Sequence, residues 1–421
     1  MMFVKILQGN LVYSPRLGEL VTLPRGALVL SDAGVLLDIL PAAPERAEAE
    51  VVDCGDALIL PSFVDMHLHA PQYPMLGMGM DLPLMDWLNT YTFRTEARFA
   101  DLDFARRTYR RLANDLITGG TTRVCMFSSL HADATLILME ELERAGVTGY
   151  VGKVNMDRGS DVLRESTGES KRETLRWLDE CGQFSRVKPI LTPRFTPSCT
   201  DELMAWLGKL GEERGLYVQS HLSENDGEIA LVKSLHPDCK QYWETYAKYG
   251  LWKDHTVMAH CVHSDERERE ALLRHNVAVA HCADSNLNIC SGVAPIRTML
   301  REGVWVTLGS DIAGGAELAM NRVITKSIRA SKILHMQTDG AAPFLTVDEA
   351  YYLGSTAGHR YFGADGGFSV GQPLHAIVVD DGIFAEPVRE LSLRERFERS
   401  IYLMDKRAIR AVWSDGRRVV G

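Results

Sequence analysis

Two histidines with the spacing of a metal-binding pair, His67 and His69, end an apolar run that begins at Ala57. Residues two apart on a β-strand point to the same face, so both imidazoles can reach one point beyond the strand. A neutral imidazole at such a point is a common ligand for Zn²⁺. An isolated His-x-His also occurs on ordinary solvated strand ends, so the rest of the chain must decide between the two interpretations.

Other polar residues that can bind a metal end further predicted strands: His221, His260, His281 and Asp311. Three neutral imidazoles and one carboxylate form a donor set that suits Zn²⁺, with Fe²⁺ as the alternative. The predicted ligands of one such ion are His67, His69, His221 and Asp311. The bound ion would lower the pKa of a water molecule and supply hydroxide near neutral pH.

The predicted catalytic residues are Glu224, His260 and Asp311. Glu224 lies three residues after His221, in the turn beyond the strand, and is predicted to act as general acid and base between the water and the leaving group. His260 is predicted to hold the water, since four protein ligands already fill most of the coordination sphere. Asp311 has an alternative role as a helix cap, and His281 as an ordinary hydrogen-bonding residue.

The elements that must position these residues alternate between apolar runs and helical patterns. Strands are predicted at 57–68, 121–127, 147–156, 187–195, 216–223, 256–262, 277–283 and 304–310. Eight such alternations predict an α/β fold, a closed (β/α)8 TIM barrel whose carboxyl strand ends converge on one site. An open doubly wound sheet would carry a Gly-rich loop after its first strand, and none is present.

Short strand patterns occupy both ends of the chain, where neither end has a core of its own. We predict that residues 1–56 and 360–421 pair into a small β-sandwich domain beside a barrel domain at 57–359. The polar stretch at 43–50 is predicted to be a connection between two of the early strands.

Composition excludes several other classes of protein. The 421 residues are 46% apolar, enough for a large core, and the net charge of −10 without a basic cluster disfavours nucleic acid as a partner. The N-terminus lacks signal-peptide features and no apolar run reaches membrane-spanning length. The 8 scattered cysteines contain no CxxC pair and predict reduced thiols in the cytoplasm. By strand alternation, Cys261 and Cys282 are predicted to be core residues.

Several segments resemble the guanine deaminase family of the amidohydrolase superfamily: HLHAPQYP, DLPLMDWLNTYTFRTEARF, KPILTPRFTPSC, QSHLSEN, TVMAHCVH, HCADSNLNICSG and GSDIAGG. The resemblance covers about residues 57–335, and the second and third segments together are more specific than the histidine pair. Two features depart from the family pattern: Ala283-Asp284 follow the His-Cys pair where a proline is common, and Cys290 is unusual. Both bear on the shape of the pocket.

The resemblance implies one zinc ion on the ligands given above, with Glu224 as proton shuttle. It also implies that Gln72, Arg194 and Phe195, together with Glu224, bind a purine in a homodimeric enzyme. Gln72 offers a donor and an acceptor, Arg194 can donate to O6 or a ring nitrogen, and Phe195 can stack. The expected reaction is attack of water at C2 of guanine, which gives xanthine and ammonia.

Three other interpretations keep parts of this pattern. An aminohydrolase of a pterin or an oxidised guanine would keep the metal residues and differ in the pocket. A binuclear cyclic amidohydrolase would add a carboxylated lysine on the fourth strand, where Lys188 lies near the start. A homologue that had lost catalysis should have lost metal ligands, and here all are present.

Overall fold

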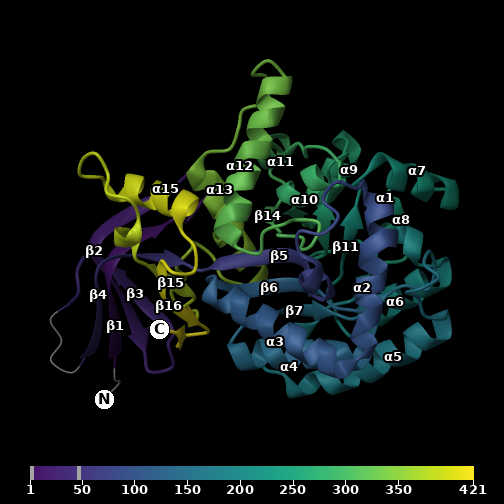
Figure 1. The fold of residues 1–421 in the computed structure, drawn as a ribbon, viewed down its shortest axis with the longest axis horizontal. Helices are drawn as coiled ribbons and strands as arrows, with labels where there is room; N and C mark the ends of the chain where they lie inside the picture. Colours follow the sequence, from purple (N-terminus) through teal and green to yellow (C-terminus); the bar gives the residue numbers. More distant parts are fainter. Residues whose placement is uncertain (1–3, 45–48) are drawn as a thin grey trace.

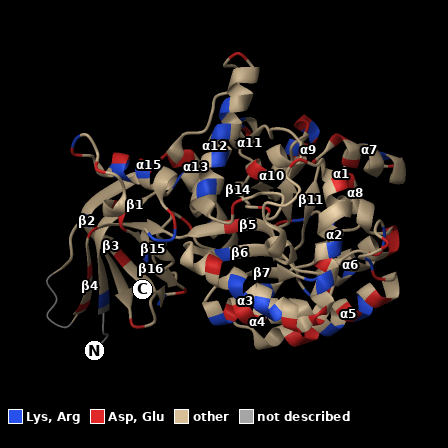
Figure 2. Cartoon of the chain, viewed as in Figure 1, with Lys and Arg blue, Asp and Glu red and all other residues tan. Residues whose placement is uncertain are grey.

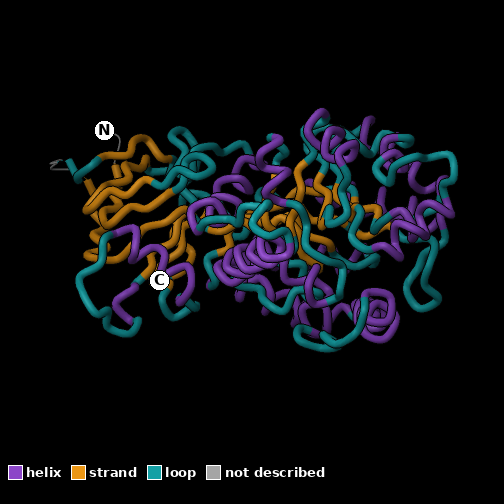
Figure 3. The backbone as a smooth tube through the Cα atoms, turned by 90° about the horizontal axis from the view of Figure 1, so that it is seen from above, coloured by secondary structure: helices purple, strands orange, loops and turns teal. Residues whose placement is uncertain are grey.

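The strands of the computed structural model, which describes residues 4–44 and 49–421, fall into two groups. Figure 1 and Figure 3 show a barrel surrounded by helices and, beside it, a sheet near which both ends of the chain lie. Of the polar connection predicted at 43–50, residues 45–48 lie outside the described residues, and residues 49–50 belong to a strand. In the described part of the chain, no helix combines the length and the apolarity needed to cross a membrane.

The barrel consists of eight parallel strands in two four-stranded sheets, ordered β5-β6-β7-β9 and β11-β12-β13-β14. Their bounds are β5 Phe63–His69, β6 Thr121–Phe127, β7 Thr148–Gly152, β9 Val187–Pro189, β11 Gln219–Leu222, β12 Val257–His260, β13 Ala278–His281 and β14 Val306–Leu308. A parallel bridge between Leu191 and Val218 joins the sheets on one side. On the other side, the Asp311 N–H donates to His67 O at 2.8 Å. These contacts close the predicted barrel.

Two short strands extend the third and fourth barrel strands, and helices follow the strands around the outside. The short strands β8 and β10 span Val154–Asn155 and Thr192–Pro193 and pair in parallel. The helices of the barrel are α3 Leu102–Thr118, α4 Ala132–Ala145, α5 Thr167–Glu180, α6 Asp201–Glu213, α7 Asp226–Leu235, α8 Glu244–Ala247, α9 Glu266–Arg274, α10 Ala283–Asn288, α11 Ile296–Glu302, α12 Met320–Gln337, α13 Val347–Gly354 and α14 Thr356–His359. Outside the barrel, the helix α15 Leu393–Leu403 precedes the last two strands.

Local sequence explains where several of these helices begin and end. Asp101 caps α3 by accepting hydrogen bonds from two N–H groups of the first turn. Ser166 and Glu169 form a reciprocal capping box at the start of α5. α4 ends where Gly146 takes a left-handed conformation, with a φ of 83°. Capping side chains and a left-handed glycine thus fix the helix boundaries on which the strand-end loops depend.

The outer faces of α3 and α4 carry both signs of charge, as Figure 2 shows. Glu141 is a buried residue of α4 and accepts hydrogen bonds from Arg106 and Arg110 of α3 and from Arg144 of α4. A buried carboxylate is tolerated when several donors satisfy its oxygens. This cluster lies on the outside of the barrel and pins α3 to α4.

The two ends of the chain form one seven-stranded sheet, ordered β17-β16-β15-β4-β1-β2-β3. Its strands are β1 Val4–Tyr13, β2 Val21–Ser31, β3 Leu36–Leu40, β4 Ala49–Pro61, β15 Ala376–Val379, β16 Ile409–Ser414 and β17 Arg417–Val420. β4 joins the early and late strands, because it pairs in parallel with β1 and antiparallel with β15. The sheet has an apolar cluster of its own, which includes Leu28, Ile59 and Trp413. All seven strands are thus connected in one sheet, separate from the barrel.

The strand predicted at 57–68 is in fact two strands. Residues 57–61 end β4 in the terminal sheet, and β5 begins at Phe63 in the barrel. Between them, the N–H of the buried Ser62 donates to His375 O in the terminal segment. Both strands are buried, so hydrophobicity runs on without a break and the sequence pattern does not mark the boundary.

Candidate active site

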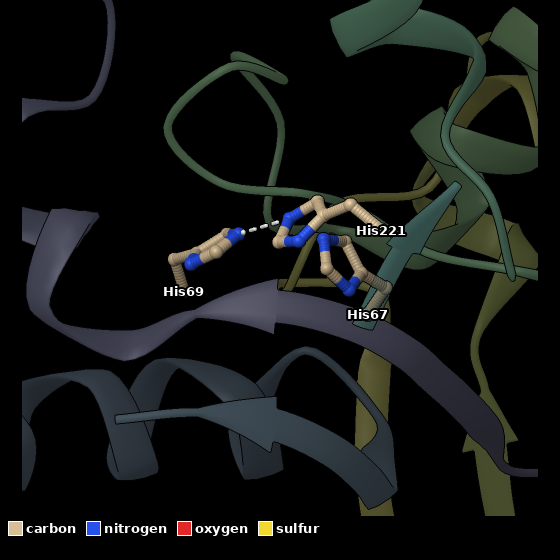
Figure 4. Close-up of side chains that lie close together, drawn as sticks. All are labelled: His67, His69 and His221. Carbon is tan, nitrogen blue, oxygen red and sulfur yellow. Dashed lines mark hydrogen bonds between the residues drawn. The ribbon is translucent and has the colours of Figure 1, made fainter. Parts of the chain in front are cut away.

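The four predicted metal ligands meet at the carboxyl ends of β5, β11 and β14. His67 and His69 come from β5 and His221 from β11, and in Figure 4 the ring of His69 faces that of His221. The two Nε2 atoms of that pair are 3.1 Å apart. Asp311 Oδ1 lies 3.2 Å from His67 Nε2 and 3.6 Å from His69 Nε2. The structure therefore brings together all four residues.

These separations fit one small cation. Ligand nitrogens about 2.0 Å from a tetrahedral zinc ion lie about 3.3 Å from one another, close to the observed distances. The tautomers fit as well: His221 Nδ1 donates to Arg194 O at 2.6 Å, which leaves its Nε2 lone pair directed at the centre. Within the described residues, the buried His67 Nε2 has no hydrogen-bond partner. Its lone pair is therefore available to bind a metal.

Burial controls the charge of these ligands. It lowers the pKa of His67, and it lowers the pKa values of His69 and His221 well below the ordinary range, aided by repulsion between the rings. Burial alone would raise the pKa of Asp311, but its contact with His67 and the other histidines holds that pKa far below its usual value. Neutral imidazoles beside an ionised carboxylate are the protonation states that a metal requires.

A second buried carboxylate, Asp65, ties β5 to the loop that carries Asp311. Its Oδ1 accepts the Ser310 N–H at 2.9 Å and the His67 N–H at 3.3 Å. Burial raises the pKa of Asp65 to about 6. Asp311 itself has a left-handed φ of 46°, a conformation that packing must hold in a residue other than glycine. Asp311 is not a helix cap, because α12 begins nine residues later with Ala319 as its N-cap.

Glu224 and His260 lie together beside the ligands. His260 Nε2 is 3.5 Å from Glu224 Oε2 and 3.8 Å from Asp311 Oδ2, outside the tight group of ligand atoms. Its Nδ1 lies 2.9 Å from Asn286 Oδ1, a partner that orients the ring and that the sequence did not point to. Burial, then the negative charges of Glu228 and Asp311, raises the pKa of Glu224 well above its usual value. A raised pKa suits a group that must take and give a proton near neutral pH.

A pocket opens on these residues and also contains the side chains expected to bind a purine. Its lining consists of His69, Gln72, Leu84, Trp87, Leu88, Arg194, Phe195, His221, Glu224, His260, Ile289 and Asp311. Gln72 comes from the 3-10 helix η1 (Ala70–Met75), which follows β5. The apolar wall comes partly from α1 (Leu84–Trp87) and from the single π turn η2 (Leu88–Thr92). The pocket thus joins polar side chains at the ligands to an apolar wall.

Glu96 is a buried residue at this site that the sequence did not point to. It lies on α2 (Phe93–Ala97) and accepts hydrogen bonds from Gln72 and from Arg194. A signal did exist, since Glu96 lies within the family-like segment TEARF. Its contact with Arg194 spans 98 positions in the chain, which local patterns do not predict.

Cys282, predicted to be a core residue, also lies close to two of the predicted metal ligands. The thiol is buried, as predicted, but its sulfur lies within 4.8 Å of ligand atoms of His67 and Asp311. The chain leaves the strand at Cys282 and turns into α10, so strand alternation does not apply there. Burial, then the charge of Asp311, raises the pKa of this thiol well above its usual value. Burial thus favours the neutral thiol, whereas metal binding requires the thiolate.

The other alternative residues lie outside the ligand group. His281 is buried, burial lowers its pKa to about 3, and it does not line the pocket. Lys188 donates to Phe184 O at 3.5 Å near the start of its strand, away from the ligands. Cys290, one of the two departures from the family pattern, is exposed, while Asp284 accepts the Ala316 N–H and fixes the loop after β14.

The buried Glu268, which accepts a hydrogen bond from the neighbour of Glu224 in the chain, Ser223, is expected to make stability depend on pH. Burial raises its pKa to about 7, against hydrogen bonds from Ser264 and Ser223. A carboxyl with a raised pKa in the folded state binds its proton more tightly there, so stability falls as pH rises from about 4.5 to about 7. In Glu268→Gln, the difference in unfolding free energy between pH 5 and pH 8 should shrink by up to about 3 kcal/mol. Urea titrations at both pH values measure it, and equal differences in the two proteins would contradict the role of Glu268.

Comparison with known proteins agrees with the fold. The model of the amidohydrolase family matches residues 58–419, and the chain belongs to that family. Within it, the chain is similar to guanine deaminases. It is 34% identical to the guanine deaminase of Dictyostelium discoideum, over 99% of this chain and 98% of that protein. It is 33% identical to that of Escherichia coli (strain K12), over 88% of this chain and 82% of that protein.

A solved structure adds the same relationship in three dimensions. Guanine deaminase from C. acetobutylicum, crystallised with guanine bound in its active site, superimposes with a TM-score of 0.95. It is 40% identical in sequence, and the match covers 99% of each chain.

Proposed function

We propose that this protein hydrolyses guanine to xanthine and ammonia. The observation that carries the proposal is the pocket itself, in which the metal-type donor set shares one cavity with Gln72, Arg194 and Phe195. The similarity of the chain to guanine deaminases over nearly its full length supports the same conclusion.

The proposed metal site consists of His67, His69, His221 and Asp311. The close approach of their donor atoms and the neutral state of the buried imidazoles support a single divalent ion there. Zn²⁺ is the proposed ion, since this donor set is one that zinc prefers. When bound, it would lower the pKa of a water molecule at the floor of the pocket.

In the proposed complex, the purine lies between Phe195 and the apolar wall, with its polar edge on Gln72 and Arg194. The Arg194 guanidinium can donate to O6 or a ring nitrogen, and the Gln72 amide can both donate and accept. Leu84 and Trp87 are buried at the wall and exclude water from the bound ring. A pocket that hydrogen-bonds a base edge rejects rings that lack the matching groups.

Glu224 moves the protons in this proposal. It takes a proton from the water as the oxygen attacks C2 of guanine, and it passes that proton to the departing amino group, which leaves as ammonia. The C2–N bond breaks, a C2–O bond forms, and the ring product is xanthine. His260, with Nε2 3.5 Å from Glu224 Oε2, holds the attacking oxygen in line with C2.

A substrate panel tests the proposal. Purified protein with its metal content measured is assayed for ammonia release from guanine, an oxidised guanine, a pterin and adenine. We expect the highest kcat/KM on guanine and at least about 100-fold less on adenine, which lacks both O6 and the amino group at C2. If ammonia were released faster from the pterin or the oxidised guanine, the proposal that guanine is the substrate would be wrong. The proposed deamination chemistry would stand.

Two further properties stay predictions from the sequence, namely the homodimer and the cytoplasmic location. Light scattering of the purified protein measures the first.

A further inference from the structure

Glu96 lies behind the pocket and contacts both residues proposed to bind the polar edge of the purine. Its side chain is 1% exposed and does not line the pocket. One oxygen accepts from Gln72 Nε2 at 2.9 Å, and the two oxygens accept from the two Nη atoms of Arg194 at 2.5 and 3.0 Å. The carboxylate thus connects two side chains that come from different strand ends.

These contacts determine which way the Gln72 amide points. The Ala313 N–H donates to Gln72 Oε1 at 3.0 Å, while Glu96 accepts from Nε2. A backbone N–H cannot accept and an ionised carboxylate cannot donate, so the reversed amide would lose both hydrogen bonds inside a buried site. The order of donor and acceptor that Gln72 offers to the pocket is therefore set by Glu96 and Ala313.

Glu96 also determines how Arg194 is held and what it can attract. The Arg194 side chain is 4% exposed, and the paired Nη atoms fix the plane of its guanidinium. The Phe93 ring, on the same helix as Glu96, lies 5.2 Å from the guanidinium carbon. A buried arginine without a partner would favour an anionic ligand, whereas one neutralised by Glu96 serves as a hydrogen-bond donor to a neutral ring.

We infer that Glu96 is a positioning residue that fixes the donor and acceptor order of Gln72 and the plane of Arg194, and so selects a neutral purine edge with an acceptor at O6. The inference rests on the proposed function for the identity of the ring. The position of Glu96 on α2 also links Gln72 and Arg194 to the segment that supplies the apolar wall of the pocket.

The test is Glu96→Gln, which keeps the size of the side chain and removes its charge. We expect kcat/KM for guanine to fall at least about 10-fold, with one metal ion per chain retained. The ratio of kcat/KM between guanine and 2-aminopurine, which lacks O6, should fall too. The matched control is Glu141→Gln, which removes a similarly buried carboxylate from three arginines on the outer helices. Kinetics of Glu96→Gln equal to those of the control would overturn the inference.

A double-mutant cycle with Arg194→Gln separates positioning from a general effect on the fold. If Glu96 acts through Arg194, its substitution should cost much less in the Arg194→Gln background than in the wild type. Equal costs in both backgrounds would mean that Glu96 acts in another way. Glu96→Gln alone leaves the buried Arg194 without its partner charge, which can destabilise the fold. The double variant removes both charges of the pair together and therefore contains no unpaired buried charge.

A crystal structure of Glu96→Gln tests the positioning on its own, whatever the substrate. We expect the Gln72 amide or the Arg194 guanidinium to leave its present orientation, and both side chains unmoved would contradict the inference. The two proposals fail differently: a wild type that does not deaminate guanine contradicts the proposed function, whereas unmoved side chains in the variant contradict the role of Glu96.

Discussion

Glu224→Gln is expected to lower turnover by about 10²- to 10⁴-fold, the range typical of the loss of a general acid and base. The amide keeps the shape of the buried side chain but cannot take a proton from water or give one to the leaving amine. Glu224 is not one of the four predicted ligands, so metal content should stay at one ion per chain. Ammonia release from guanine and elemental analysis of the same sample measure both quantities.

The control for Glu224→Gln is again Glu141→Gln, on the outside of the barrel. That variant should keep its activity, since the wild-type Glu141 carboxylate only holds α3 against α4. Turnover of Glu224→Gln within a few-fold of wild type would remove Glu224 from the proposed proton transfer. Loss of metal together with activity would instead make it part of the metal site.

His221→Ala is expected to abolish activity by removing the metal. The imidazole faces His69 Nε2 at 3.1 Å and is oriented by its bond to Arg194 O. Loss of a partner that only orients a ligand weakens binding about 10- to 100-fold, so loss of the ligand itself should cost at least about 100-fold in affinity. Purified variant protein should contain little zinc, and added zinc should not restore ammonia release.

His281→Ala is the matched control for metal content. His281 ends β13, which β12 separates from the strand of His221, and it is also buried, but it lies outside the ligand group. The account predicts that this variant keeps one metal ion per chain. If His221→Ala kept its metal and His281→Ala lost it, the ligand assignment would be wrong.

Much of the site was predictable because a barrel places the carboxyl ends of its strands around one point. The pair His67 and His69 lies far from His221 and from Asp311 in the chain, yet all of them end strand-like apolar runs. Once the alternation of strands and helices was recognised, the polar residues that end those runs had to converge. The structure brings them together as that reasoning requires.

Other features depend on contacts that no local pattern records. Glu96 and Asn286 lie on helices after the strands, and only the three-dimensional course of those segments aims Glu96 at Arg194 and Asn286 at His260. The division at Ser62 between the terminal sheet and the barrel is hidden because both flanking strands are buried. Cys282 lies near the ligands because its strand ends at His281, two residues before the predicted end at residue 283, and the chain turns there into α10.

The most direct test of the central claim is zinc titration of metal-free protein, followed by xanthine formation from guanine. The account predicts that activity rises with added zinc and reaches its plateau at one ion per chain, because His67, His69, His221 and Asp311 provide one set of donors. A plateau at two ions per chain would indicate a binuclear site. No xanthine at any zinc concentration would contradict the proposed function.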